Sequence, residues 1–229
     1  MTHSTASTTS SSWCDAMSMD ETLREQWLNV RDRLQAKQLL SLPGPTLSVR
    51  IPGSNEIWFG TALDTTPKRI ALLDIAELPP SADLHAAIYG LRGDVGAIAT
   101  GGGEFGGCLA DFGGVMPGVF DEQVRHLGKM GPVADQLESL AESLRAGGNV
   151  FLANRHPVCL GVTGSRLALN AELFEKCAKA YVLAVATGGT VKPLPWIVRY
   201  VANGRLMKDE RKAKERFRQG LLPVESRGY

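Results

Sequence analysis

Residues that cross-link a chain or hold a metal are scarce in this sequence. The four cysteines, Cys14, Cys108, Cys159 and Cys177, form no CxxC pair, and their spacing fits no zinc-finger template. The four histidines form no HxH, HxxxH or HExxH pair. A chain of 229 residues can bury a core without disulfides. We therefore interpret Cys159 and Cys177, which lie in apolar stretches, as small core residues.

An excess of one charge and long apolar runs are also lacking. Lys and Arg total 25 and Asp and Glu total 24, which leaves a net charge of +1 and no global field for nucleic acid or anionic membranes. The apolar runs are far shorter than the roughly 20 residues of a membrane span. Residues 1–12 lack the apolar core of a secretory signal and the arginines of a transit peptide. We expect a cytoplasmic protein without nucleic-acid or membrane partners, and a flexible Ser/Thr-rich tail over 1–17.

Glycine, in contrast, is abundant, with 25 residues in the chain against an average usage of about 7%. Gly101, Gly103 and Gly106 match G-x-G-x-x-G after an apolar run at 95–99. A dinucleotide site needs a helix directly after this motif, whereas the further glycines up to Gly118 disfavour one. We therefore predict a long loop over 101–118, whose amides form a nest for an anion more readily than for a dinucleotide.

Hydrophobic periodicity predicts the main elements. A capping box at Ser18 predicts the start of a helix with Leu23, Trp27, Val30 and Leu34 on its apolar stripe. Alternating residues predict strands, and three- and four-residue spacing predicts helices. The expected strands are 47–51, 56–60, 70–75, 95–99, 150–153 and 158–162. The later expected helices are a helix introduced by 79–81, a short helix at 120–126, one beginning at Pro132, a long one over 169–187 and two within 195–220.

Two further features have ordinary explanations. His85 lies among apolar residues of an expected helix and is interpreted as a hydrogen-bonded packing residue, whereas His156, at a strand junction, is the most site-like histidine. From Arg205 to Arg218 there are seven Lys or Arg and three Asp or Glu, a net charge of +4. Because no aromatic platform accompanies this charge, we interpret the segment as a solvated helix with Glu210–Lys214 pairing rather than as a binder of acidic partners.

Several segments, in order, resemble the class II aldolase/adducin family over roughly residues 20–200. The matching residues are Leu47-Ser48-Val49-Arg50, Leu84-His85-Ala86-Ala87-Ile88-Tyr89, Arg92, Asp94-Val95, Ala97-Ile98, Leu152-Ala153-Asn154, Gly161, Thr163 and Ala180-Tyr181. The resemblance implies one α/β domain, here 18–203, with a mixed, mostly antiparallel central sheet and helices on both sides. A basic C-terminal helix and tail would follow over 204–229. It also implies a homo-oligomer, a tetramer in this family.

The family's enzymes use a zinc-type metal, held by an HxH pair after the central strand and by a third histidine, and a glutamate as acid/base. The sequence departs from that pattern at these positions. Thr100 and Gly102 stand at the HxH pair, and Arg155 stands at the third histidine, with His156 one residue later. Further departures are Ser81 at the glutamate, Pro45 and Thr46 at a Gly-Asn pair, and Ala62 at the glycine after Thr61. Thr and Gly offer no imidazole nitrogen, and a guanidinium has no lone pair to donate.

Two interpretations of Arg155 stay open. Its fixed charge could face the amides of 101–103 and hold a carboxylate or phosphate without metal, or it could pair with a structural carboxylate. The candidate anion cleft comprises Thr61, Thr100, Gly101, Gly102, Gly103, Arg155 and His156. We predict no metal and no cofactor, unless displaced ligands hold zinc or another divalent ion. Catalytic residues are unassigned, and whether Glu104, Asp111 or Tyr229 reaches the cleft is open.

Two functions from different classes follow from the resemblance. The first is a degenerate class II aldolase/adducin-like protein without catalytic zinc, which binds a small anionic molecule or serves in assembly, as the non-enzymatic adducin branch does. The alternative is an active aldehyde-lyase or decarboxylase acting on a small sugar, phosphosugar or carboxylate. It would work either without metal, through Arg155, His156 and Glu104 or Asp111, or with displaced metal ligands.

Overall fold

The computed structural model describes residues 11–73 and 78–225, with the side chains from residue 19 onward. Six strands form one sheet in the order β3-β2-β1-β4-β6-β5, and every strand pairing is antiparallel. The strands are β1 (Thr46–Arg50), β2 (Glu56–Thr61), β3 (Lys68–Ala71), β4 (Ala97–Thr100), β5 (Val150–Ala153) and β6 (His156–Gly161). Parallel pairing occurs only in two isolated bridges of the described residues. The expected antiparallel character of the sheet is confirmed, and the named strands contain no parallel pair.

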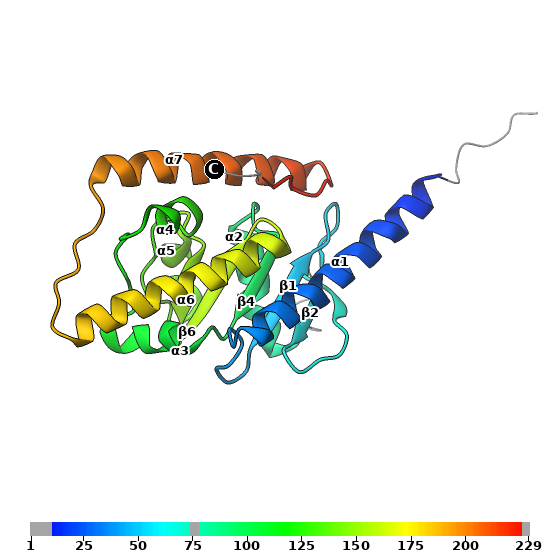
Figure 1. The fold of residues 1–229 in the computed structure, drawn as a ribbon. Helices are drawn as coiled ribbons and strands as arrows, with labels where there is room; N and C mark the ends of the chain where they lie inside the picture. The colour runs from blue at the N-terminus through cyan, green and yellow to red at the C-terminus, as the bar shows by residue number, and fades with distance from the viewer. Residues whose placement is uncertain (1–10, 74–77, 226–229) are drawn as a thin grey trace, which may run out of the picture.

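Helices cover both faces of the sheet (Figure 1). On one face lie α1 (Ser11–Ala36), α3 (Glu104–Cys108) and α6 (Gly164–Ala186), and on the other lie α2 (Asp83–Leu91) and α5 (Leu140–Leu144). The two faces of the sheet carry separate cores, because successive side chains of a strand point to opposite faces. Leu47 and Val49 of β1 belong to the core under α1 and α6, and Ile57 and Phe59 of β2 belong to the core under α2 and α5. The expected helices on both sides are therefore confirmed.

The first helix packs as predicted but begins earlier. The stripe of Leu23, Trp27, Val30 and Leu34 is buried, and the Trp27 indole donates a hydrogen bond to the carbonyl of Leu47 at 2.9 Å, which joins α1 to β1. The predicted start at Ser18 is wrong, because the helix already runs from Ser11. The boundary of the predicted 1–17 tail is shifted accordingly, and its first ten residues lie outside the described part of the chain.

Two expected elements are displaced by long-range pairing. The third strand is Lys68–Ala71 rather than 70–75, of which 74 and 75 lie outside the described residues. No helix begins at Pro132. Instead, Ala134 bridges Ala153 and its N–H donates to Leu152 at 2.8 Å, so this stretch runs extended beside β5. Helical structure begins only with η3 (Leu137–Ser139), which leads into α5.

The glycine-rich segment contains helix, contrary to the predicted loop. It forms α3 and then η2 (Leu109–Phe112). The carboxylate of Glu175, from α6, accepts hydrogen bonds from the N–H groups of Phe105 at 2.7 Å and Gly106 at 2.9 Å. This contact satisfies free amides of the first turn and stabilises α3 despite its poor helix propensity.

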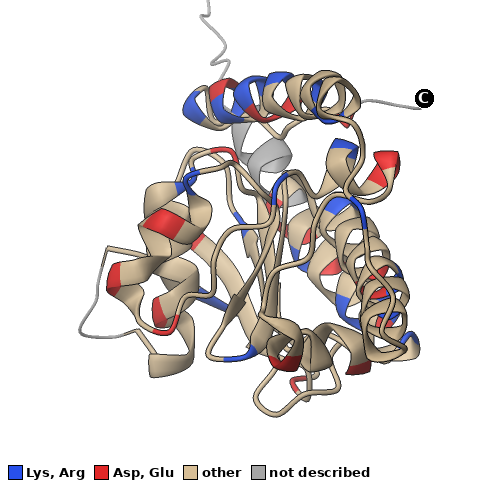
Figure 2. Cartoon of the chain, turned by 90° about the vertical axis from the view of Figure 1, so that its left-hand side faces the viewer, with Lys and Arg blue, Asp and Glu red and all other residues tan. Residues whose placement is uncertain are grey.

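The C-terminal region forms one helix, α7 (Trp196–Arg218), where two were expected. It also extends across the boundary predicted between 203 and 204. Lys and Arg recur along α7, at the top of Figure 2. The predicted Glu210–Lys214 pair is wrong: Glu210 is buried and lies 3.1 Å from the Arg92 guanidinium. Arg125, in α4 (Asp121–His126), pairs with Asp209 at 2.7 Å, so α7 is tied to the body at two points.

The other long helix, α6, also begins earlier than the predicted Leu169. Thr163 is its N-cap, and the Thr163 hydroxyl accepts a hydrogen bond from the N–H of Arg166 at 3.1 Å. Within the described residues, no helix combines the length and the apolar character that crossing a membrane requires.

Candidate functional site

The predicted cleft residues gather where the ends of three neighbouring strands meet. Thr46 at the start of β1 pairs with Thr61 at the end of β2, and its N–H donates to the hydroxyl of Thr100 at the end of β4 at 2.9 Å. Thr100 in turn pairs with Val158 of β6, whose strand begins at His156. The fold therefore brings the threonines, the glycine run and the β5–β6 turn to one edge of the sheet.

At this edge, a chain of hydrogen bonds passes from Thr100 into the buried layer under α2. The Thr100 and Thr46 hydroxyls lie 2.7 Å apart, and Thr46 lies 2.8 Å from Nε2 of His85. The other ring nitrogen, Nδ1, lies 2.7 Å from the Ser48 hydroxyl, which also contacts the Tyr89 hydroxyl at 2.9 Å. His85 is fully buried, and both of its ring nitrogens are engaged within the protein. The interpretation of His85 as a hydrogen-bonded packing residue is confirmed.

Burial governs the titration of this chain of side chains. It lowers the pKa of His85 to about 3, because a charged imidazole would lose its hydration, and it raises the pKa of Tyr89. His85 is therefore neutral near pH 7. A fully buried, neutral imidazole with a hydrogen bond at each ring nitrogen fixes the packing of its neighbours. It is poorly placed to exchange protons with a substrate.

The glycine run is tightly packed rather than open. A Cβ atom at Gly102 would lie 2.5 Å from the Pro157 ring, and one at Gly103 would lie 2.6 Å from the Glu175 carboxyl carbon. The amides after this run already hold the Glu175 carboxylate. These amides belong to Phe105 and Gly106 rather than to the predicted nest at 101–103, where the N–H of Gly101 donates to the carbonyl of Pro157 at 3.1 Å.

The remaining predicted residues lie on the outside of this edge. Asn154 and Arg155 form the two-residue β5–β6 turn with φ of 46° and 72°, the left-handed conformation that such turns require. Arg155 pairs with Asp111 at 2.5 Å, and both side chains are exposed. Of the two interpretations of Arg155, pairing with a carboxylate is the one observed. Thr61 donates from its N–H and hydroxyl to Asp64, which lowers the pKa of that carboxyl.

These residues do not fit a divalent metal. Thr100 uses its hydroxyl within the hydrogen-bond chain, Gly102 packs against Pro157, and Arg155 carries a positive charge. His156 is half-buried, and its Nδ1 has no hydrogen-bond partner among the described residues. Nowhere in the described ranges do three His, Cys, Asp or Glu side chains come together as a metal site. Tyr229 lies outside the described residues.

Sequence reasoning missed a second region, beneath α7. Cavities of about 480 Å³ and 780 Å³ lie there, and Arg125, His126 and Arg166 line both of them. These three residues come from α4 and α6, so no local motif links them. The only signal in the sequence is the Arg125-His126 pair, which the 3.6-residue pattern places on a surface helix.

Solved structures that share this architecture include two named as aldolases and one named as an aldolase II superfamily protein. An L-fuculose 1-phosphate aldolase is 19% identical, with 81% of this chain and 96% of that chain covered and a TM-score of 0.68. The L-fuculose 1-phosphate aldolase from Glaciozyma antarctica is 14% identical, with 96% and 94% covered and a TM-score of 0.67. An aldolase II superfamily protein from Pseudomonas syringae is 12% identical, with 88% and 94% covered and a TM-score of 0.63.

The chain has the class II aldolase fold. No protein-family model matches its sequence, and no curated protein matches it. The resemblance found in the sequence is therefore confirmed as a divergent example of the class II aldolase fold. At identities below 20%, the likeness supports the fold alone, and the function has to be argued from the residues of the site.

Proposed function

We propose that this chain is a metal-free binding and assembly protein that keeps the class II aldolase fold without aldol chemistry. One observation carries the proposal: the residues at the positions that the resemblance gives to metal ligands bond to, or pack against, other parts of the protein. Thr100 bonds to Thr46, Gly102 packs on Pro157, and Arg155 pairs with Asp111.

The chemistry of aldol cleavage supports the same proposal. The reaction builds negative charge on an enediolate oxygen, which a bound metal stabilises as a Lewis acid. The hydroxyl of Thr100 supplies no comparable charge, and Arg155 is an exposed side chain already paired with a carboxylate. Ser81, at the position of the family's glutamate, offers no carboxylate for proton transfer.

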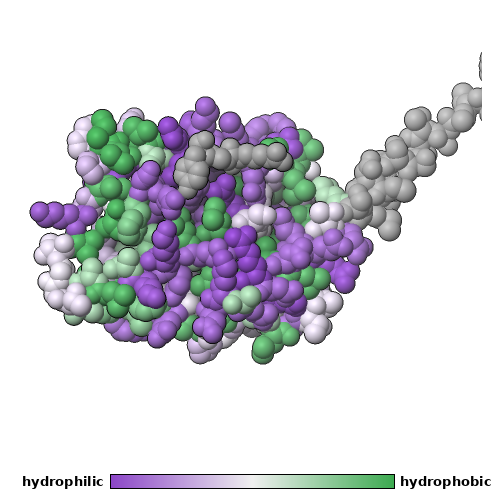
Figure 3. Space-filling model, in the orientation of Figure 1, coloured by the Kyte–Doolittle hydropathy of each residue, from purple (hydrophilic) through white to green (hydrophobic). Residues whose placement is uncertain are grey.

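We also propose that the chain self-associates through the outer face of α7. Trp196 and Tyr200, one helical turn apart, are 69% and 74% exposed. Figure 3 shows apolar residues at this end of the molecule, at the upper left. Large exposed aromatic side chains are typical of protein interfaces, and the family resemblance favours a second copy of this chain as the partner.

A cleavage assay tests the loss of aldol chemistry. The purified protein is mixed with L-fuculose 1-phosphate, the substrate named for two structural relatives, in the presence of Zn²⁺, Mn²⁺ or Co²⁺. We expect no aldehyde product above the level of the His156→Ala variant. Metal-dependent cleavage that His156→Ala abolishes would overturn the proposal in favour of a lyase with displaced ligands, and metal-independent cleavage lost in Arg155→Ala would favour the metal-free lyase.

A further inference from the structure

We propose that the cavity between α4, α6 and α7 binds a small organic anion with an apolar body, and that Arg166 and Lys212 hold its charged group. This inference rests on the proposed binding role and gives it a site and a ligand class. The site lies away from the strand edge described above and uses none of the residues at the family's metal positions.

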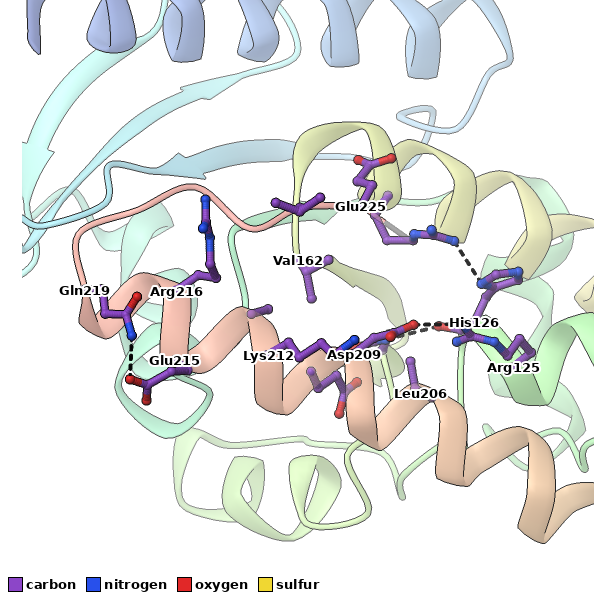
Figure 4. A pocket seen from close by; sticks show the side chains of 15 residues that line it. Arg125, His126, Val162, Leu206, Asp209, Lys212, Glu215, Arg216, Gln219 and Glu225 are labelled. Atoms are coloured by element: carbon purple, nitrogen blue, oxygen red, sulfur yellow. Dashed lines mark hydrogen bonds and ion pairs between the residues drawn. The ribbon is translucent and has the colours of Figure 1, made fainter. Parts of the chain in front are cut away.

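The size and lining of the cavity suit a small molecule. Its two parts, about 480 Å³ and 780 Å³, fall in the range of small-molecule sites and share Arg125, His126 and Arg166. Figure 4 shows Lys212 and Asp209 extending from α7 toward Arg125 and His126, with Val162 between the elements. Charged groups and an apolar wall therefore meet in one hollow.

The carboxylates of the narrower part of the cavity already contact other groups of the protein. Four of them line this part of about 480 Å³, while Asp121 and Glu122 line the wider part. The four contacts are Asp209 with Arg125 at 2.7 Å, Glu210 with Arg92 at 3.1 Å, Glu215 with Gln219 at 2.8 Å, and Glu225 with Thr163. Burial also raises the pKa of Glu210 to about 8, which reduces its negative charge near pH 7.

The cations, in contrast, are not fully compensated. Arg166 donates from Nη1 to Nδ1 of His126 at 2.9 Å, because a guanidinium has no lone pair with which to accept. Burial and the charges of Arg166 and Arg125 lower the pKa of His126 to about 4, so its ring is neutral at pH 7. In the described part of the chain, neither Arg166 nor Lys212 forms an ion pair.

This arrangement selects an anion. The half-buried guanidinium of Arg166 lies beside a neutral imidazole, so it has lost part of its hydration without gaining a counter-charge. A bound carboxylate or phosphate would neutralise its positive charge. Because Nδ1 of His126 accepts from Arg166, the ring hydrogen resides on Nε2, which adds a neutral donor to the same wall.

The wider part of the cavity accounts for the apolar body. Leu169 and Leu173 of α6 line it opposite Ile197, Val198 and Val201 of α7. Ile197 and Val201 remain 54% and 51% exposed, so a ligand's aromatic or aliphatic group would remove their side chains from water. Burial of this apolar surface favours binding and adds to the attraction of the charged head.

Calorimetric titration with phenyl phosphate and benzoate tests the site. Two control ligands separate the contributions: inorganic phosphate has the charged group without an apolar body, and benzyl alcohol has an aromatic body without charge. We expect at least one of the two aromatic anions to bind at micromolar to millimolar concentration, more tightly than inorganic phosphate, while benzyl alcohol shows no saturation. Arg166→Gln and Lys212→Gln should each weaken binding by about tenfold, whereas Lys208→Gln, on α7 but outside the lining, should not.

Three results would overturn the inference: no saturation by either aromatic anion up to about 10 mM, equal affinity in the wild type and both lining variants, or equal affinity for benzyl alcohol. Lys212 is exposed, so its variant keeps the test valid if Arg166→Gln does not fold. The cleavage assay separates this inference from the proposed function, since aldol activity would refute the latter while leaving the titration unaffected.

Discussion

At the scale of single residues, His85 is the centre of the hydrogen-bond chain that joins Thr100 and Thr46 to Ser48 and Tyr89. Its two ring nitrogens contact Thr46 and Ser48, from alternate positions of one strand. Because the side chain is fully buried, protonation would place a charge away from water, and the hydroxyl that donates to the neutral ring would have to turn and accept instead. His85 therefore couples folding to pH.

The pH dependence of unfolding tests this coupling. The folded-state pKa of His85 is lowered to about 3, below its ordinary value of 6.5, so its contribution to stability is present above pH 6.5 and is lost as the pH falls toward 3. We expect His85→Asn to reduce the free energy of unfolding by about 3 kcal/mol at pH 7. We also expect it to lose less stability than the wild type between pH 7 and pH 5, as measured by urea unfolding.

Ser48→Ala is the matched control, because it removes a contact of the imidazole and keeps the titrating group. It should lower stability at pH 7 while retaining a steep loss of stability toward pH 5. An identical pH slope in the wild type and in His85→Asn would show that His85 does not carry the coupling.

At the scale of elements, α3 shows how a contact distant in sequence decides local structure. Eight glycines in 101–118 favour a loop by propensity, yet the Glu175 carboxylate from α6 fixes two amides of a helical turn. The pairing spans about seventy residues, so no local pattern contains it. A contact between elements also explains why the helix predicted at Pro132 does not form, because Ala134 bridges Ala153 of β5.

Replacing Glu175 tests this explanation. We expect Glu175→Ala to reduce the free energy of unfolding by about 2 kcal/mol, because two amide hydrogen bonds to a charged acceptor are lost. Hydrogen exchange of the Phe105 and Gly106 amides should accelerate. Glu172→Ala, on the same helix, removes partly exposed contacts to Arg33 and Lys37 and should cost about 0–1 kcal/mol. Equal losses in the two variants, with unchanged exchange at 105 and 106, would contradict the account.

Periodicity predicted the strands and the buried faces of the helices, whereas helix boundaries and contacts distant in sequence were missed. The hairpin of β1 and β2 and the buried stripe of α1 follow from periodicity alone. For the site, the resemblance gave the positions around Thr100 and Arg155, but the hydrogen bonds from the Phe105 and Gly106 amides to Glu175 depend on packing between α3 and α6. The cavity under α7 combines side chains from three helices, so it became visible only in the fold.

At the scale of the whole molecule, the exposed Trp196 and Tyr200 on α7 are the basis of the proposed self-association. Light scattering coupled to size exclusion should show an oligomer, a tetramer if the family pattern holds. The Trp196→Asp, Tyr200→Asp double variant should shift to smaller species, because it places charges in an apolar interface. Leu63→Asp, at a residue that is 90% exposed outside α7, is the control and should leave the mass unchanged. A monomeric wild type would refute self-association.

We propose that internal hydrogen bonds and packing stand in this chain where the resemblance places a metal site. The most direct test is the metal content of protein purified from zinc-supplemented culture, measured by mass spectrometry per chain. The account predicts zinc, manganese and cobalt far below one equivalent, with no difference between the wild type and His156→Ala. About one equivalent in the wild type, lost in His156→Ala, would contradict it.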